Sequence, residues 1–394
     1  MGSHPFITTT VITQQFDTVV TEKLNTIYIV GTKGAGGSIA NNQIREIPTL
    51  TEFDSIVGTN AASKPAYRFL RAIDGAVPVY FVNGFSSNAG ATLADNLIAG
   101  FLELAKNVRL TPGIVVVPEI AGLTANTEAV YNAAQNLVSN SLMNWEYYHN
   151  LTLAANDKTK AIAEVANLTS PQGHSSAFWG YGRDADNNQI PLSVVAAART
   201  TFLNRNRSGY FSPSAFQDAI PFSSVDSVYL PKWYIGTDEY TELNDKNINT
   251  IYLDGDGITR SNYTLCGART LASDQAWRYI NTRYAANNVF YRTAQILKPF
   301  LFLPADIASS VDSNVIGYQE QSINADIILN LKVLLDQLAN EGAFSTPPTL
   351  TDGTQPDSYN IIPSRLPDGN LAITIELYLV QTREKISLSF IKKG

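Results

Sequence analysis

Cysteine and charge are both scarce in this chain of 394 residues. It has a single cysteine, Cys266, and only 16% of its residues are Asp, Glu, Lys or Arg, compared with roughly 25% in typical soluble chains. One cysteine excludes a disulfide framework within the chain, and the apolar context of Cys266 predicts a small buried side chain. Neutral polar and aromatic residues replace the charges, which is typical of a surface that other subunits cover. A neutral extracellular domain has the same composition and stays an alternative.

An excess of basic residues and long apolar runs are also missing. The formal net charge is −7, which argues against a protein that coats nucleic acid, because such proteins need a basic surface. No stretch approaches the roughly 18 apolar residues of a membrane span, so direct membrane insertion is not expected. Residues 1–5 have neither the basic region nor the apolar run of a secretory signal. We therefore expect a soluble protein made in the cytoplasm.

Catalytic and metal-binding patterns are absent from the sequence as well. The three histidines, His4, His149 and His174, have no metal-ligand spacing to one another or to Cys266. The glycine-rich turn at 31–37 lacks the phosphate-binding pattern GxxxxGKS or GxxxxGKT, and we expect a flexible loop there. The pattern GxSxG of a nucleophile elbow is missing too, although a Ser-His-Asp site is defined by geometry alone. The sequence thus predicts no enzyme, no cofactor and no metal site, with a cryptic hydrolase as the alternative.

Apolar runs and helical patterns alternate through the first half of the chain. Residues 26–30 and 114–117 are β-branched runs bounded by turn residues, and the second is typical of a strand buried on both faces in a parallel sheet. Amphipathic helical patterns stand between and after such runs. This alternation predicts an α/β layer domain over 86–245, preceded by an N-terminal part of the core at 25–85.

The last third of the chain predicts a long helix and strand-forming segments. Over 317–342, apolar residues follow one helical stripe that ends at a glycine. The stripe consists of Ile323, Ile327, Ile328, Leu331, Leu334, Leu335 and Leu338. Apolar residues then alternate at 371–379 and 386–390, which predicts a β-hairpin after a Pro/Gly-rich loop at 345–369. Residues 5–20 are strand-forming too, and two such ends with few charges predict that partners take them up.

The segment 265–302 combines a helix with an excess of positive charge. Ser273 or Asp274 is expected to cap this helix. Its apolar side carries Trp277, Ile280, Tyr284 and Ile296. Its basic residues are Arg278, Arg283, Arg292 and Lys298, with no acidic residue after Asp274. They form either a solvated face with surface ion pairs or a face that contacts an acidic protein surface.

Four segments of the chain, in their order, resemble a known family. The first, 27–58, reads as strand, glycine, loop, proline, Glu-Phe and glycine, and the second, 69–82, as a helix and an aromatic strand. The third is 176–198, and the fourth and most specific is 267–283. The signature residues of the fourth segment are Gly267, Arg269, Thr270 and Trp277. In this pattern the chain is similar to the contractile tail sheath proteins of contractile phage tails, R-type pyocins and contractile injection systems.

The resemblance implies a structural subunit, not an enzyme, that polymerises in stacked rings around an inner tube. Contraction of the sheath would drive the tube through a target envelope. The implied partners are further copies of the chain joined by exchanged terminal strands, the inner tail tube protein, and baseplate and tail-terminator proteins, with no nucleic acid. The particle would be a virion tail or a contractile injection particle, made in the bacterial cytoplasm. A non-contractile virion decoration or adhesin protein is the alternative.

The expected fold class is α/β, or α+β for the whole chain, with five parts. These are an N-terminal extended arm at 1–24, the core part at 25–85, a middle α/β domain at 86–245 that resembles a protease-type fold without its triad, a tube-side α+β domain at 246–370 and a C-terminal strand hairpin at 371–394. The residues expected to link subunits are Phe6, Ile7, Val11, Ile12, Ile373, Ile375, Leu377, Ile386, Leu388 and Phe390. The residues expected to face the tube are Arg278, Arg283, Arg292 and Lys298.

Overall fold

The computed structural model of the protein covers most of the chain. It describes residues 24–107, 111–140, 145–231, 239–254, 262–297, 313–347, 349, 355–365 and 371–380. Several residues with an expected role lie outside this part of the chain. They are Phe6, Ile7, Val11, Ile12, Lys298, Ile386, Leu388 and Phe390.

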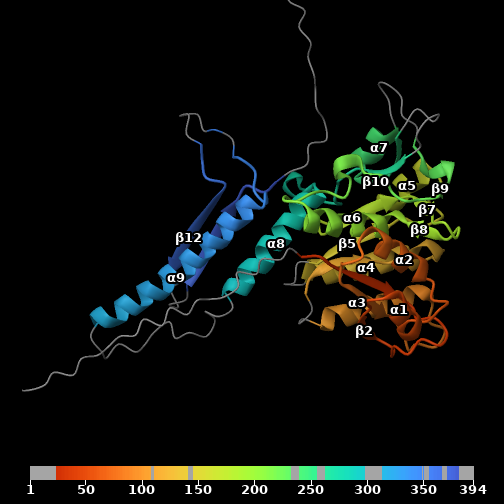
Figure 1. Ribbon diagram of the computed structural model, residues 1–394, viewed down its shortest axis with the longest axis horizontal. Coiled ribbons are helices and arrows are strands. Elements are labelled where there is room, and N and C mark those ends of the chain that lie inside the picture. Colours follow the sequence, from red (N-terminus) through yellow and green to blue (C-terminus); the bar gives the residue numbers. More distant parts are fainter. Residues whose placement is uncertain are drawn as a thin grey trace, which may run out of the picture.

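A mixed sheet of eight strands forms the centre of the molecule (Figure 1). In spatial order the strands are β11 (Asn262–Cys266), β10 (Ile248–Asp254), β6 (Ser175–Trp179), β5 (Glu146–Asn150), β4 (Gly113–Val116), β1 (Thr26–Gly31), β3 (Val79–Asn83) and β2 (Gln43–Glu46). The six inner strands run parallel, and β11 and β2 pair antiparallel at the two edges. Strands β1, β4, β5 and β6 are buried along their whole length, as expected for parallel strands covered on both faces.

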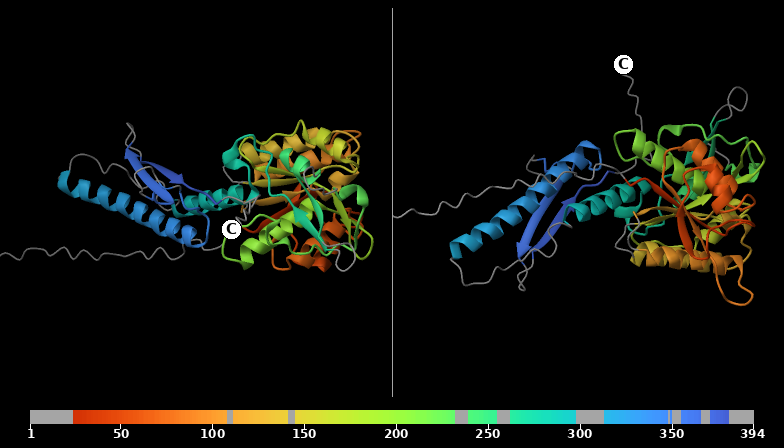
Figure 2. Two further views of the ribbon diagram at one scale, coloured as in Figure 1. Left: turned by 90° about the horizontal axis from the view of Figure 1, so that it is seen from above. Right: turned by 60° about the horizontal axis from the view of Figure 1, so that its bottom comes forward.

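Helices cover both faces of this sheet (Figure 2). On one face α3 (Leu93–Lys106) packs against α4 (Thr127–Asn140), and on the other α2 (Lys64–Ile73) packs against α6 (Leu192–Asn206). The shorter helices are α1 (Leu50–Ile56), α5 (Lys158–Val165) and α7 (Glu239–Asp245). The α/β layer architecture predicted from the alternating pattern is therefore confirmed.

Small elements complete this α/β body. A three-stranded sheet consists of β8 (Gln189–Pro191), β7 (Tyr181–Arg183) and β9 (Ser224–Val225). Short 3-10 helices are η1 (Pro118–Gly122), η2 (Ala215–Gln217), η3 (Ser227–Tyr229) and η4 (Gln275–Trp277). Side-chain oxygens start several of the helices, since Thr49 caps α1, Thr92 caps α3 and Asp157 caps α5.

A second unit projects from the α/β body (Figure 1). Helix α8 (Ile280–Leu297) leads out of the body, and α9 (Ser313–Asn340) packs along a hairpin of β12 (Tyr359–Arg365) and β13 (Leu371–Leu377). The apolar stripe predicted for α9 is confirmed in its second half, where Leu331, Leu334, Leu335 and Leu338 are fully buried. The helix ends at Asn340, and Gly342 just beyond it has a φ of +78°, a conformation that favours glycine.

The sheet does not divide where the domain boundaries were expected. Strand β1 pairs with β4, across the expected boundary at 85/86, and β10 pairs with β6, across the boundary at 245/246. The parallel strands of this one sheet come from three of the expected parts of the chain. Changes in composition along the sequence therefore did not show that these parts form a single structural unit. The strand β5 was missed because its sequence, Glu-Tyr-Tyr-His-Asn, is polar although all five residues are buried.

Three local expectations also differ from the structure. Strand β13 pairs with β12, which lies inside the expected loop at 345–369, while the expected partner at 386–390 lies outside the described residues. Asp274 caps the 3-10 helix η4, and the following α-helix begins only at Ile280. Cys266 is half-buried at the end of the edge strand β11, where only one neighbouring strand covers it.

Candidate assembly surfaces

The loop after β11 is fixed to the sheet by one buried side chain, Asn249 of β10. Its Nδ2 donates to the backbone oxygens of Ala177 (2.9 Å) and Arg269 (2.8 Å), and its Oδ1 accepts from the Arg269 N–H (2.9 Å). Gly267 has a φ of +98°, and a Cβ at this position would lie 2.6 Å from Asn249 Oδ1. The positive φ and the lack of room for a Cβ therefore both require glycine at position 267.

The other signature residues close the same loop from within. The Thr270 N–H donates to the backbone oxygen of Arg278 (2.9 Å), and its hydroxyl donates to that of Trp277 (2.6 Å). The buried guanidinium of Arg269 donates to the backbone oxygen of Asn244 (2.8 Å). Because these contacts lie within the chain, the signature segment positions the start of α8 against the sheet.

Arg283 lies in the interior, between α8 and the sheet, with 3% of its surface exposed. Its Nε and Nη2 donate to Asn287 Oδ1 (2.8 and 2.6 Å), and its guanidinium lies 4.6 Å from the centre of the Trp277 ring. Asn287 in turn donates to Glu146 Oε1 of β5 (2.9 Å). Burial raises the pKa of Glu146 to about 7, although the nearby Arg283 charge acts in the opposite direction. A buried polar network thus joins α8 to the centre of the sheet.

Arg292 joins α8 to the end of α9. It is fully buried, and its Nη1 and Nη2 donate to the two carboxylate oxygens of Glu341 (2.6 and 3.1 Å). The hydroxyl of Tyr210 and the amide of Gln337 also donate to this carboxylate (3.3 and 3.1 Å). A carboxylate that accepts from both arms of one guanidinium fixes the direction as well as the distance of the contact.

These positions bear on the residues expected to face the tube. Arg283 and Arg292 point into the chain and are engaged there, so a tube-facing role is not compatible with this conformation for either one. They resembled surface residues because their partners come from distant segments of the chain. Arg278 is half-exposed and donates to Gln275 Oε1 (2.9 Å), so its expected contact with the tube stays a prediction. Lys298 lies outside the described residues.

The described hairpin side chains that were expected to link subunits are half-buried within their own chain. Ile373, Ile375 and Leu377 lie in β13, opposite β12, and are half-buried. Ile375 and Leu377 pack with the core cluster that α9 joins, whereas Ile362 and Tyr378 are exposed. Within the described residues, neither outer edge of this two-stranded sheet pairs with a further strand. Such an edge is a site for strand addition.

The outer side of α9 also presents apolar residues. Leu329 is 60% exposed and Val333 is 48% exposed, one helical turn apart. Together with the exposed residues of the hairpin, they give the projecting unit apolar surface on both its helix and its sheet. Adjacent exposed apolar residues are typical of protein interaction surfaces.

The two histidines in the described part of the chain, His149 and His174, are both buried. His149 is fully buried with its Nδ1 3.0 Å from the Tyr147 hydroxyl, and burial lowers its pKa to about 3. Burial and the Arg283 charge lower the pKa of His174 to about 4, and its Nδ1 lies 3.0 Å from the backbone oxygen of Trp145. In the part of the chain that the structure describes, no group of three or more His, Cys, Asp or Glu side chains could hold a metal ion.

The glycine-rich turn after β1 is held by a buried carboxylate. Glu119 Oε1 accepts from the Thr32 N–H (2.8 Å) and its Oε2 from the Thr32 hydroxyl (2.7 Å). A Cβ at Gly31 would lie 2.5 Å from Oε1, and burial raises the pKa of Glu119 to about 7. Whether it is ionised or protonated, a carboxyl group at this position does not favour the binding of a phosphate. Its hydrogen bonds also fix the first residues of the turn.

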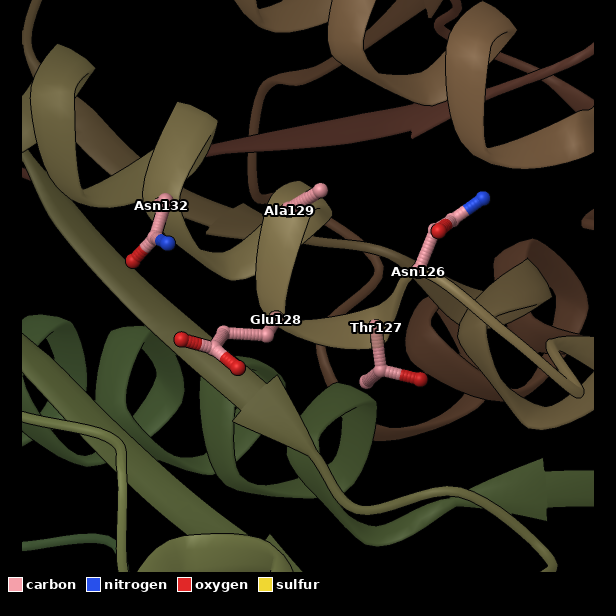
Figure 3. A pocket seen from close by; sticks show the side chains of 5 residues that line it. All are labelled: Asn126, Thr127, Glu128, Ala129 and Asn132. Atoms are coloured by element: carbon pink, nitrogen blue, oxygen red, sulfur yellow. The ribbon is translucent and has the colours of Figure 1, made fainter.

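A depression open to solvent lies at the start of α4 (Figure 3). It is lined by Asn126, Thr127, Glu128, Ala129 and Asn132. The labelled side chains point in different directions, and Glu128 is the one carboxylate among them. Such a lining lacks the second acid or base that general acid–base catalysis needs.

Comparisons with known proteins give a result at the level of the fold. No protein-family model and no curated protein matches the chain.

Among the described residues, no helix combines the length and apolar character needed to span a membrane.

Solved structures match over nearly the whole chain. A chain from the contracted sheath complex of an extracellular contractile injection system, PVC, has a TM-score of 0.67 at 15% identity, and the match covers 100% of this chain and 98% of that one. A chain from the contracted helical sheath of the anti-feeding prophage has a TM-score of 0.64 at 15% identity, with 94% and 93% covered. The sheath tail protein from Listeria innocua has a TM-score of 0.57 at 8% identity, with 92% and 93% covered. The chain therefore has the fold that the sheath proteins of contractile tails and injection systems share.

Proposed function

We propose that this protein is a structural subunit of a contractile sheath, which polymerises around an inner tube and contracts to drive the tube through a target envelope. The observation that carries the proposal is the match to the PVC sheath complex over the full length of both chains. The match includes the projecting unit of α8, α9, β12 and β13 as well as the α/β body. A shared fold in the body alone would suit many functions.

Self-assembly is supported by the surface of the projecting unit. The outer edges of β12 and β13 are available in the described part of the chain, next to exposed apolar side chains. In the sequence beyond that part, residues 5–20 and 386–390 are predicted to form strands. We propose that these segments of neighbouring subunits add to the hairpin edges, each main-chain hydrogen bond contributing about 0.5–1.5 kcal/mol.

The protein acts without catalysis under this proposal. The glycine-rich turn is held by Glu119, and His149 is enclosed in the core. The work of contraction then comes from an extended assembly that relaxes to a more tightly packed one, a change between two arrangements of subunit interfaces.

Contact with the tube is proposed for Arg278, which is half-exposed next to the signature loop. Its positive charge suits an acidic tube surface. Arg278→Glu should loosen the attachment of the sheath to the tube and leave sheath self-assembly intact. Lys106→Glu, which reverses an exposed charge on α3, is the matched control. Attachment that is unchanged in Arg278→Glu would place the tube contact elsewhere.

The same comparisons support a proposal about the particle. One similar chain comes from the baseplate structure of the anti-feeding prophage, with 16% identity and a TM-score of 0.67. We propose that the stack of rings begins on a baseplate and ends at a tail-terminator protein. The particle would be a virion tail or a contractile injection device, assembled in the bacterial cytoplasm.

Electron microscopy of the purified full chain tests the proposal. Tubes or stacked rings are expected under assembly conditions, and a protein that stays strictly monomeric there would refute the sheath function. Deletion of 381–394 should prevent assembly but leave the folded subunit, because β13 ends at Leu377. A virion decoration or adhesin protein would instead keep its oligomeric state after this deletion.

A further inference from the structure

Helix α8 buries an unusual number of polar side chains for a helix that leads out of the body. The buried polar residues are Asn281, Thr282, Arg283, Asn287, Asn288 and Arg292. A buried polar group needs a hydrogen-bond partner, and here the partners come from different parts of the chain. Arg283 contacts the sheet through Asn287, and Arg292 contacts the end of α9.

Asn288 holds the beginning of the described chain. The Leu24 N–H donates to Asn288 Oδ1 at 2.7 Å, and Asn288 Nδ2 donates to the backbone oxygen of Tyr284 at 2.8 Å. Asn288 is fully buried and Leu24 is buried as well. This contact joins residues 264 positions apart in the sequence. It therefore fixes the point at which the segment 1–23 joins the body.

Thr282 holds the end of the described chain in the same manner. Its hydroxyl donates to the backbone oxygen of Val380 at 2.6 Å, and the Val380 N–H donates to the backbone oxygen of Ala343 at 3.0 Å. Thr282 is buried on the first turn of α8. The point at which the segment 381–394 leaves is thus fixed to α8 and to Ala343, three residues after the end of α9.

We propose that α8 is the junction that sets where both terminal segments leave the subunit, with Thr282 and Asn288 as its positioning residues. The two residues are six positions apart, which is about 9 Å along the axis and about 120° around it. A single helix holds this spacing, because its backbone hydrogen bonds do not change when a neighbouring subunit moves. The meaning for assembly rests on the proposed sheath function, since only there do the terminal segments link subunits.

The experiment compares four variants of the full chain, which are three single variants and the double variant of Thr282 and Asn288. Thr282→Val removes one hydroxyl at nearly constant volume, and Asn288→Leu removes the acceptor for Leu24. Thr293→Val is the control, because it removes a hydroxyl from the same helix that has no partner in the described part of the chain. Hydrogen exchange of single amides is measured in dissociated subunits, and tubes are examined by electron microscopy.

The expected results are specific to each site. Amide exchange at Leu24 should become about fivefold faster in Asn288→Leu, and exchange at Val380 about fivefold faster in Thr282→Val, as expected for the loss of one hydrogen bond. Thr293→Val should leave both unchanged. Tubes should be lost or irregular in the double variant of Thr282 and Asn288 and normal in the control.

Two results would overturn the inference. Unchanged exchange at both Leu24 and Val380 would show that α8 does not hold these points. Regular tubes from the double variant would show that the exit points do not matter for assembly. A wild-type chain that forms no tubes, together with the expected changes in exchange, would refute the sheath function and leave the junction in place. Thr282→Val decides the first question even if Asn288→Leu does not fold.

Discussion

The contact between Arg292 and Glu341 should be the strongest link between α8 and α9. Arg292 is fully buried, while the Glu341 side chain is 21% exposed. Arg292→Met removes the cation and leaves a partly solvated carboxylate with Tyr210 and Gln337 as donors. Glu341→Gln leaves a guanidinium in the interior without a counter-charge, although one hydrogen bond can remain.

The size of the effect follows from this burial. Breaking a buried ion pair by removal of one partner costs about 3–5 kcal/mol. Since Glu341 reaches solvent in part, we expect about 2–4 kcal/mol for either single variant. In the double variant neither charge is left unpaired, so its loss should be smaller than the sum of the two by more than about 1 kcal/mol.

Hydrogen exchange of single amides is the suitable assay, because it measures local opening. The Arg292–Glu341 contact stabilises the docking of α9 and not every part of the molecule. The protected amides of Leu334, Leu335 and Leu338 report this docking, since their side chains are fully buried. The exposed pair of Arg68 and Asp186, 2.7 Å apart, provides a control cycle in which no coupling should be resolved. Additive effects of the Arg292 and Glu341 variants would refute the reasoning.

Three further predictions concern the stability of the subunit, measured by urea unfolding under monomeric conditions. Gly267→Ala should destabilise by about 1–3 kcal/mol because of its positive φ and the contact with Asn249, whereas Gly122→Ala, with open space around it, should have little effect. Leu335→Ala should cost about 2–5 kcal/mol because its side chain is fully buried in the hydrophobic core. Burial raises the pKa of Glu119 from 4.5 to about 7, so the native state keeps a proton that the unfolded state releases. The free energy of unfolding of the wild type should therefore fall by on the order of 3 kcal/mol as the pH rises from about 4.5 to 7. Glu119→Gln has no carboxyl proton at this position, so this fall should be absent from the variant. An equal pH dependence in both proteins would contradict this assignment.

Local patterns in the sequence predicted those elements whose signal is local. The β-branched runs at 26–30 and 114–117 and the apolar stripe of α9 all correspond to structure. In each case the neighbours along the chain decide the conformation, through strand propensity or a helical period. The order of four short segments was enough to predict the fold class as well.

Long-range polar contacts could not be predicted in this way. Arg283 and Arg292 are charged residues on an amphipathic pattern, and nothing close to them in the sequence indicates burial. Their partners, Glu146 and Glu341, lie 137 and 49 positions away in the sequence. The strand β12 was missed for a related reason, because its pairing with β13 outweighs a composition rich in loop-forming residues.

The buried polar side chains of α8 also explain why an apolar helix would serve less well at this place. Apolar packing is non-directional, so a helix held by it alone can shift along its neighbours at small cost. The hydrogen bond that Thr282 donates to Val380 and the one that Asn288 accepts from Leu24 are each satisfied only at one position of the partner. A shift of α8 leaves buried polar groups unpaired, which costs about 1–3 kcal/mol for each group. In the proposed sheath, a subunit passes force between its two ends during contraction and needs this kind of fixed register. The junction should therefore keep its geometry in the extended and the contracted assembly, while the contacts between subunits change.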